Sequence, residues 1–188
     1  PAIDYVVTKI PRFAFEKFPG AEPILTTAMK SVGEAMAIGR TFAESLQKAL
    51  RSLETGLTGL DEIEIEGFGK DDDRNVLRAA LGRPTPDRLL VVAQALRLGL
   101  AHEDIHAACG IDPWFIAHLE QMLVVDKRTA ASTLRHSTRE LMLESKRSGA
   151  SDEEIAKLWN VKSSSVRARR HELGVVPVFK SGETCAAE

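Results

Sequence analysis

Aromatic residues are scarce in this 188-residue chain, at 5% of it, whereas all hydrophobic residues together make up 44%. A hydrophobic core must therefore consist mainly of Leu, Ile, Val and Ala. A formal net charge of −2 gives the chain no general attraction to nucleic acid or to anionic membranes. The sequence has no apolar run of transmembrane length and no signal peptide, so we expect a cytoplasmic protein without membrane contacts.

Cysteine is rare as well. Cys109 and Cys185 lie far apart and have no metal-ligand spacing, which favours a reduced setting over a disulfide or a metal site. The chain begins at Pro1 instead of an initiator Met. We therefore expect a segment that was processed or excised from a longer protein.

Strand signals are confined to the N-terminal part. Residues 5–10 are rich in β-branched side chains and stop at Pro11, which predicts a strand that ends there. Residues 29–38 predict a second short strand. Thr41 followed by Glu44 forms a capping-box pattern, so an amphipathic helix is expected directly after it.

The rest of the chain reads as short helices, which makes the predicted fold class mainly α with a small α/β remnant at the N-terminus. A helix with Leu134, Leu141 and Met142 on its inner face is expected over residues 131–148. The other expected helix starts are Asp72 or Asp73 for a helix that ends at Gly82, Thr85 ahead of Pro86, Asp112 ahead of Pro113, and a second capping box of Ser151 and Glu154.

An internal similarity occurs at a fixed offset of 50 residues. Each copy predicts a glycine turn, a short helix, a tight turn around Gly110 or Asn160, and a second helix. Because a solenoid needs about three or more repeats, two copies indicate a paired helical-hairpin domain. The matched pairs are Gly99 with Gly149, Glu103 with Glu153, Ile105 with Ile155, Ile111 with Val161, and Ile116 with Val166.

Residues 102–106 match the H-E-x-x-H pattern of zinc proteases. His102 and His106 would share one helical face, where both could bind a metal. The pattern nevertheless occupies the first turn of a short helix, and its counterpart in the second copy, residues 152–156, has neither histidine. We therefore predict capping and surface roles for these residues and no zinc.

Residues 151–173 resemble a helix-turn-helix with Arg167, Arg169 and Arg170 on its second helix, which is the placement a DNA-binding helix needs. Local charge is only mildly positive, and the first copy carries Trp114 and Phe115 where a DNA-binding helix would enter the groove. Nucleic-acid binding is therefore an alternative hypothesis, and the main prediction is no nucleic-acid partner. No nucleophile–base pair and no phosphate loop stands out.

Three blocks of the sequence carry a family resemblance. They are Asp4–Phe13 with Glu16–Phe18, Met29–Glu34 with Met36–Thr41 and Glu44–Leu50, and Pro177–Lys180 with Thr184–Glu188. In order and spacing these blocks resemble the large chain of carbamoyl phosphate synthetase. The middle of the chain is similar more loosely, through Pro84–Arg88 and Asp112–Phe115. Ala35, Phe179 and Glu183 are small departures from the family pattern.

The resemblance implies a division of the chain into three parts. Residues 1–54 would be the C-terminal end of the carboxyphosphate domain, which is the first of two ATP-grasp halves. Residues 55–180 would be the helical oligomerisation domain, and residues 181–188 would lead into the carbamoyl-phosphate half. The family's catalytic and metal-binding residues fall outside this sequence, so we expect no catalytic, cofactor-binding or metal-binding residue in it.

The resemblance further implies a parent ATP-dependent ligase that makes carbamoyl phosphate from ATP, bicarbonate and glutamine-derived ammonia, for pyrimidine and arginine biosynthesis. That parent would use ATP, Mg²⁺ or Mn²⁺, and K⁺, and would bind a glutaminase small chain. The fragment by itself would be inactive and would self-associate. Small domains leave much apolar surface exposed, and the candidates for core or interface are Trp114, Phe115, Leu119 and Leu123.

Overall fold

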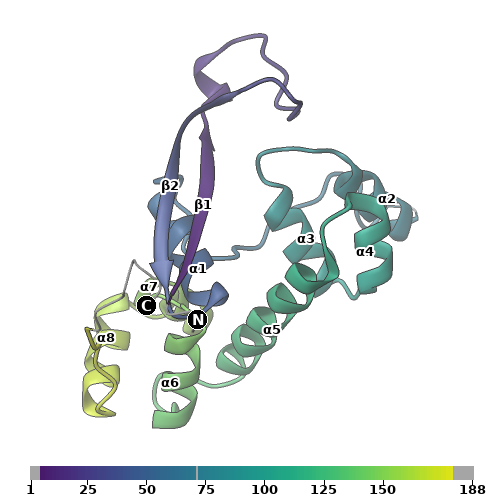
Figure 1. Cartoon of the computed structure of the whole chain (residues 1–188). Helices are drawn as coiled ribbons and strands as arrows, with labels where there is room; N and C mark the ends of the chain where they lie inside the picture. The colour runs from purple at the N-terminus through teal and green to yellow at the C-terminus, as the bar shows by residue number, and fades with distance from the viewer. Residues whose placement is uncertain (1–4, 71, 180–188) are drawn as a thin grey trace, which may run out of the picture. The chain divides into compact units, whose positions relative to one another are not determined.

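The structure is a computed structural model that describes residues 5–70 and 72–179. That part is mainly helical and has one two-stranded sheet (Figure 1), which confirms the predicted fold class. The expected lead-in, residues 181–188, lies outside the described residues. In chain order the elements are β1 (Val6–Phe13), a 3-10 turn (Phe15–Lys17), β2 (Ser31–Gly39), α1 (Phe42–Ser52), α2 (Asp73–Gly82), α3 (Arg88–Arg97), α4 (His102–Cys109), α5 (Pro113–Ala130), α6 (Arg139–Arg147), α7 (Asp152–Trp159) and α8 (Ser163–Glu172).

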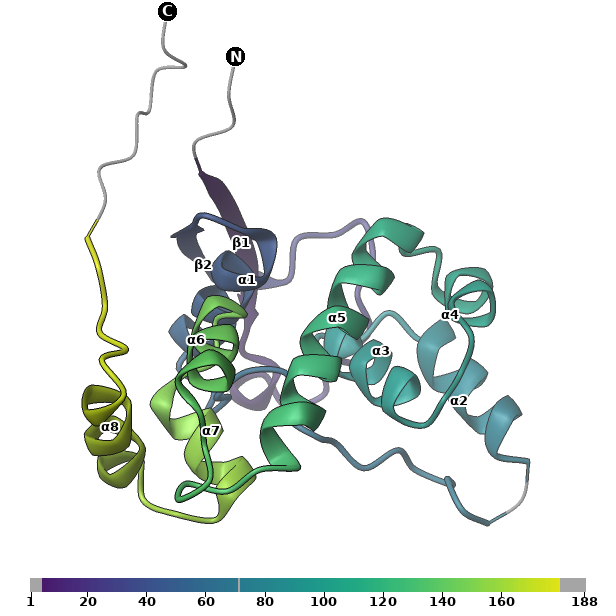
Figure 2. The ribbon, with the colours of Figure 1, turned by 90° about the horizontal axis from the view of Figure 1, so that it is seen from below.

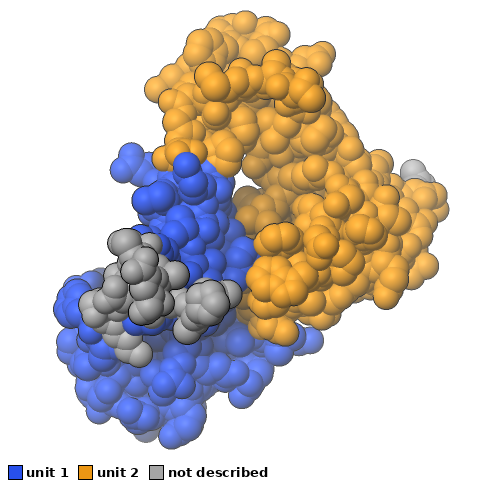
Figure 3. All heavy atoms as spheres, viewed as in Figure 1, with its two compact units in different colours: residues 1–10, 35–59, 124–188 blue, residues 11–34, 60–123 orange. Residues whose placement is uncertain are grey.

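Two compact units divide the chain (Figure 3). Unit 1 contains the described residues of the ranges 1–10, 35–59 and 124–188, and unit 2 contains those of 11–34 and 60–123. Helices α6, α7 and α8 therefore belong to unit 1 together with α1, although α1 ends at Ser52 and α6 begins only at Arg139. Helices α2, α3 and α4 belong to unit 2.

The second predicted strand, residues 29–38, is confirmed as β2. Its side chains alternate, with Ala35 and Ala37 buried and Met36 and Ile38 exposed. This alternation is expected for a strand that is covered on one face only. The sheet thus leaves large apolar side chains uncovered on its other face.

The first predicted strand extends further than expected. We predicted that it ends before Pro11, but β1 continues to Phe13. Proline cannot donate to a neighbouring strand, so it is excluded from central strands and tolerated at an edge. Both strands of a two-stranded sheet are edges, which is why β1 accommodates Pro11.

Helix α1 begins as predicted. The hydroxyl of Thr41 accepts a hydrogen bond from the amide of Glu44 at 3.2 Å. The Glu44 carboxylate accepts from the amide of Arg40 at 2.8 Å, one residue before the N-cap. Both bonds satisfy backbone amides that the helix itself leaves unpaired. The buried face of α1 includes Leu46 and Leu50.

In unit 2, α2 packs against α3 and α4 (Figure 2). The core between them is aliphatic, as the composition required, and includes Leu81, Val92 and Ile105. The predicted start of α2 is confirmed, because the Asp72 carboxylate accepts from the amide of Asn75 at 3.2 Å.

The predicted start of α3 at Thr85 is wrong. The carbonyl of Thr85 accepts from the amide of Arg88 at 3.1 Å, so residues 85–88 form a turn. The helix begins only at Arg88, with Asp87 at its N-cap position. Pro86 fits the second position of such a turn as well as it fits the start of a helix, which explains the misassignment.

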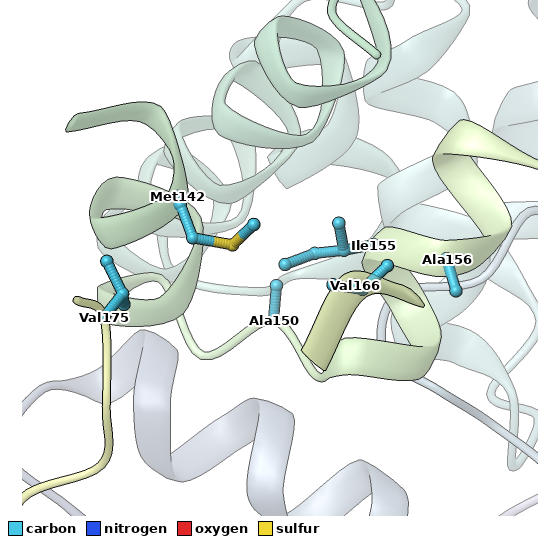
Figure 4. Close-up of a cluster of buried hydrophobic side chains, with 6 residues drawn as sticks. All are labelled: Met142, Ala150, Ile155, Ala156, Val166 and Val175. Atoms are coloured by element: carbon cyan, nitrogen blue, oxygen red, sulfur yellow. The ribbon is translucent and has the colours of Figure 1, made fainter. Parts of the chain in front are cut away.

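Helices α6, α7 and α8 enclose a second core, drawn in Figure 4. Met142 on α6 points toward Ile155 on α7, and Val166 on α8 lies beside them. Ala150 and Val175 complete the cluster from the connecting segments. The core is therefore built without aromatic side chains at its centre.

The helix predicted over residues 131–148 is only half correct. α6 starts at Arg139, because Thr138 caps it by accepting from the amide of Leu141 at 3.2 Å. Residues 131–138 form turns instead. Leu134 still packs against the core cluster from this non-helical segment.

The internal similarity at an offset of 50 residues holds in the structure. α4 and α7 both begin at matched positions, His102 and Asp152, and α5 and α8 begin at Pro113 and Ser163. The turn between the paired helices has a left-handed residue in both copies, Gly110 (φ 70°) and Asn160 (φ 52°). The matched pairs Ile105 with Ile155 and Ile116 with Val166 are all fully buried.

The repeat supplies a matched pair of glycines for a stability test. Gly99 and Gly149 both have positive φ, at +81° and +93°. A Cβ on Gly149 would lie 2.9 Å from Cβ of Gln47 and 3.0 Å from the carbonyl oxygen of Ala43, whereas a Cβ on Gly99 would meet nothing within 4 Å.

We predict that Gly99→Ala lowers the free energy of unfolding by about 1 kcal/mol, the cost of a left-handed alanine. Gly149→Ala should cost about 3 kcal/mol, because steric overlap adds to the backbone strain. Urea denaturation followed by circular dichroism measures both. Equal losses for the two variants would contradict the close packing of α1 against residue 149.

Candidate functional site

The most exposed large aromatic pair on the described helices is Trp114 with Phe115, at the start of α5. Their side chains are 50% and 43% exposed, and their rings meet edge to face with centroids 5.0 Å apart. The imidazole of His118 stacks on the Trp114 indole at 3.8 Å. Together these three residues, the α5 aromatic patch, form a preorganised apolar surface.

The local sequence explains why the patch points outward. Asp112 accepts a hydrogen bond from the amide of Trp114 at 2.8 Å, which starts α5 at the position predicted from Asp112-Pro113. Ile116 and Leu119 on the same helix are fully buried. Because these two residues anchor the inner face, the first turn presents Trp114 and Phe115 to solvent.

The structure divides the four residues predicted for core or interface into buried and exposed ones. Leu119 belongs to the core and Leu123 is partly buried, whereas Trp114 and Phe115 are exposed. At the matched positions of the second copy stand Ser164 and Ser165 on α8, where Ser164 is exposed and Ser165 is partly buried. The repeat therefore folds without aromatic side chains at these positions.

The H-E-x-x-H residues are engaged in ordinary contacts. His102 opens α4 and lies 3.0 Å from a carboxylate oxygen of Glu120, and His106 Nδ1 donates to the carbonyl of Ile111 at 2.7 Å. Within the part of the chain that the structure describes, no group of three or more His, Cys, Asp or Glu side chains could hold a metal ion.

The three arginines of the nucleic-acid hypothesis do not form a common basic face. Arg170 is buried and Arg169 binds Ser137 and Glu172. Only Arg167 extends into solvent, with its side chain 72% exposed. The geometry therefore gives the nucleic-acid alternative no support.

Arg170 instead belongs to a partly buried charge cluster that the sequence did not reveal. Its guanidinium bonds the Asp152 carboxylate at 3.2 Å and the carbonyl of Val175 at 2.9 Å, while Lys146 reaches Asp152 at 3.0 Å. The cluster joins α6, α7, α8 and the segment after α8. No sequence motif indicates it, because its members are between 5 and 29 residues apart and come from four segments.

Burial by itself would raise the pKa of the Asp152 carboxyl, but Lys146 and Arg170 outweigh it and hold that pKa below its ordinary value. Burial lowers the pKa of Lys146, an effect that Asp152 partly offsets. The cluster therefore works as a set of compensated charges, and its function is to hold three helices together.

Each unit has a groove on its described surface. A groove of about 410 Å³ lies between Thr58 and the α7–α8 turn, and one of about 400 Å³ lies beside the acidic segment Glu62–Ile65. No helix of the described chain is long and apolar enough to cross a membrane. We still predict that residues 1–188 hold no catalytic or cofactor-binding residue.

Comparison with known proteins identifies what these elements are similar to. The family model described as "Carbamoyl-phosphate synthetase large chain, oligomerisation domain" matches residues 34–174. The carbamoyl phosphate synthase large chain of Mesorhizobium japonicum is 58% identical over 195 residues and that of Rhizobium meliloti 60% over 189 residues. The arginine-specific, chloroplastic large chain of Arabidopsis thaliana is 47% identical over 188 residues. Each comparison covers 100% of this chain but only 16% to 17% of the relative.

The charge cluster generates a test with a control on the same helix. Arg170→Leu should lower the free energy of unfolding by about 3 kcal/mol, because it removes the buried guanidinium that pairs with the partly buried Asp152. Arg167→Leu, which removes an exposed charge 3.7 Å from the same carboxylate, should cost less than about 1 kcal/mol. Chemical denaturation compares the two. A loss for Arg167→Leu as large as that for Arg170→Leu would contradict the assignment.

Proposed function

The chain belongs to the carbamoyl phosphate synthetase large-chain family, and on that premise we propose that it is a self-association module within a longer enzyme chain. The chain spans only 16% to 17% of the length of the relatives it matches. Its helical part corresponds to the oligomerisation domain of that family. The single observation that carries the proposal is the exposed α5 aromatic patch.

The proposal extends to the whole protein. Its relatives are named carbamoyl phosphate synthase large chains, and one of them is named arginine-specific. The whole protein would be a cytoplasmic ATP-dependent ligase that makes carbamoyl phosphate from bicarbonate and glutamine-derived ammonia. It would use ATP, Mg²⁺ or Mn²⁺, and K⁺, and would work with a glutaminase small chain. All of its catalytic residues would lie outside residues 1–188.

We propose the domain limits 1–54, 55–180 and 181–188 for the end of the carboxyphosphate domain, the oligomerisation domain and the lead-in to the next half. The exposed Met36 and Ile38 on β2 support only the assignment of the sheet to a larger domain, and not the exact limit at residue 54. A two-stranded sheet with one uncovered apolar face is marginal by itself, so it is expected to belong to a larger domain.

The repeat explains why the aromatic patch indicates an interface. The two helix pairs have the same buried positions, but only the first has aromatic side chains, Trp114 and Phe115, on its outer surface. The corresponding positions of the second pair are Ser164 and Ser165. Exposed aromatic side chains that folding does not require are typical of contact sites. A second copy of the chain is the occupant that the family's oligomerisation domain implies.

The energetics favour a weak, reversible contact. A Trp and a Phe that are half exposed leave roughly 200 Å² to bury, so a two-fold contact covering both pairs gains on the order of 10 kcal/mol. Loss of translational and rotational freedom costs about 4–15 kcal/mol. The association should therefore depend strongly on protein concentration.

The double variant Trp114→Ser with Phe115→Ser transfers the residues of the second copy into the first. We expect the chain to sediment as a concentration-dependent dimer or larger oligomer, and the double variant to remain monomeric with an unchanged circular dichroism spectrum. Analytical ultracentrifugation measures the association.

Val176→Ser is the matched control, because Val176 is 54% exposed and lies outside the α5 aromatic patch. This variant should associate like the parent chain. Association that survives the double substitution, or a chain that is monomeric at every concentration, would refute the proposal.

A further inference from the structure

A second buried polar contact, between α1 and α7, is separate from the charge cluster. Gln47 on α1 and Glu154 on α7 are 107 residues apart, and both are buried. Nε2 of Gln47 donates to Oε1 of Glu154 at 3.2 Å. Glu154 was predicted only as part of a capping box with Ser151. That prediction is confirmed, but it does not account for the contact with α1.

Gly59 packs directly against both side chains of this contact. A Cβ on this residue would overlap Oε1 of Gln47 and Oε1 of Glu154, and would lie 2.7 Å from Cδ of Glu154. The two oxygens therefore lie close together against the backbone of residue 59, where water has little access. Any larger side chain at this position would displace one of them.

Both of these oxygens are hydrogen-bond acceptors when Glu154 is ionised. Among the described residues, Oε1 of Gln47 has no hydrogen-bond partner. A carboxylate cannot supply one, whereas a neutral carboxyl has an O–H that can donate to it. A proton on Glu154 would thus provide the donor that this buried oxygen lacks, and its loss leaves two acceptors together.

Burial and a nearby negative charge favour the neutral form of Glu154. Burial, followed by repulsion from Asp126 on α5, raises the pKa of Glu154 to about 7. Gln47, the Ser151 amide and Arg51 on α1 act in the opposite direction. Arg51 is itself committed to the carbonyl of Gly149, to which it donates at 2.8 Å. Glu153, the exposed neighbour of Glu154 on α7, adds a further negative charge to this region.

We propose that Glu154 and Gln47 form a proton-dependent latch between α1 and α7. The neutral carboxyl donates a second hydrogen bond, to Oε1 of Gln47, beside the one that it accepts from Nε2. Ionisation removes the second bond, leaves Oε1 of Gln47 without a donor and loosens the contact. The latch is a property of unit 1 alone. That the latch links two domains rests on the domain limits proposed above, which assign α1 and α7 to different domains.

The sign of the pH effect follows from the raised pKa. In the unfolded chain Glu154 ionises near 4.5, its ordinary value, and in the folded chain near 7. The stability that the neutral carboxyl contributes is therefore fully present below about pH 4.5 and is lost as the pH rises through 7. Glu154→Gln keeps a donor at every pH and retains the capping pattern, so it mimics the latched state.

The test compares urea unfolding of the 188-residue chain and two variants at pH 5 and pH 8. The unfolding constant of the parent chain should rise, relative to that of Glu154→Gln, on the order of 100-fold between the two pH values. Glu153→Gln removes an exposed carboxylate one residue away and should follow the parent. A constant ratio between the parent and Glu154→Gln would overturn the latch.

A second measurement keeps the proposal testable if Glu154→Gln fails to fold. The side-chain carboxyl ¹³C shift of Glu154 in the parent chain should titrate near pH 7, and backbone amide shifts of α1 and α7 should change with the same midpoint. A midpoint near 4.5, or a titration near 7 that α1 does not sense, would overturn the proposal. Self-association is measured on other residues, so either proposal can fail alone.

Discussion

The close approach of α1 to the start of α7 is the constraint on which unit 1 depends. A glycine at position 149 admits the Gln47 side chain, and Gly59 admits the buried contact between Gln47 and Glu154. Arg51 then binds the carbonyl of Gly149. Because these contacts join residues 35–59 to residues 124–188, the N-terminal helix and the C-terminal helices form one unit despite their distance along the chain.

The repeat separates what folding needs from what function adds. Both copies keep aliphatic residues at the buried positions, and both keep a left-handed residue between the paired helices. The outward positions have diverged. Trp114 and Phe115 in one copy correspond in sequence to Ser164 and Ser165 in the other, and His102 corresponds to Asp152, which anchors the charge cluster. The same helix pair thus carries an exposed aromatic pair in the first copy and an internal ion network in the second.

Much of the fold could be predicted from local signals. The N-caps at Thr41, Asp72 and Ser151 are set by residues three positions apart, and the repeat by spacing alone. The misassigned starts of α3 and α6 lie where turn and helix signals coincide or where a long stretch contains no helix breaker. The contacts of Glu154 and Arg170 could not be predicted, because they join segments that only tertiary packing brings together. The family resemblance, by contrast, came from blocks of residues and was confirmed by relatives that cover the whole chain.

Hydrogen–deuterium exchange as a function of protein concentration tests the central claim, self-association through the start of α5, most directly. The amides of residues 114–116 bond only Asp112, at the N-terminal end of α5, where helices fray and amides exchange quickly in a monomer. The account predicts that their protection rises with concentration, while α7 and α8 are unaffected. An oligomer whose concentration-dependent protection lies elsewhere and leaves residues 114–116 unchanged would contradict it.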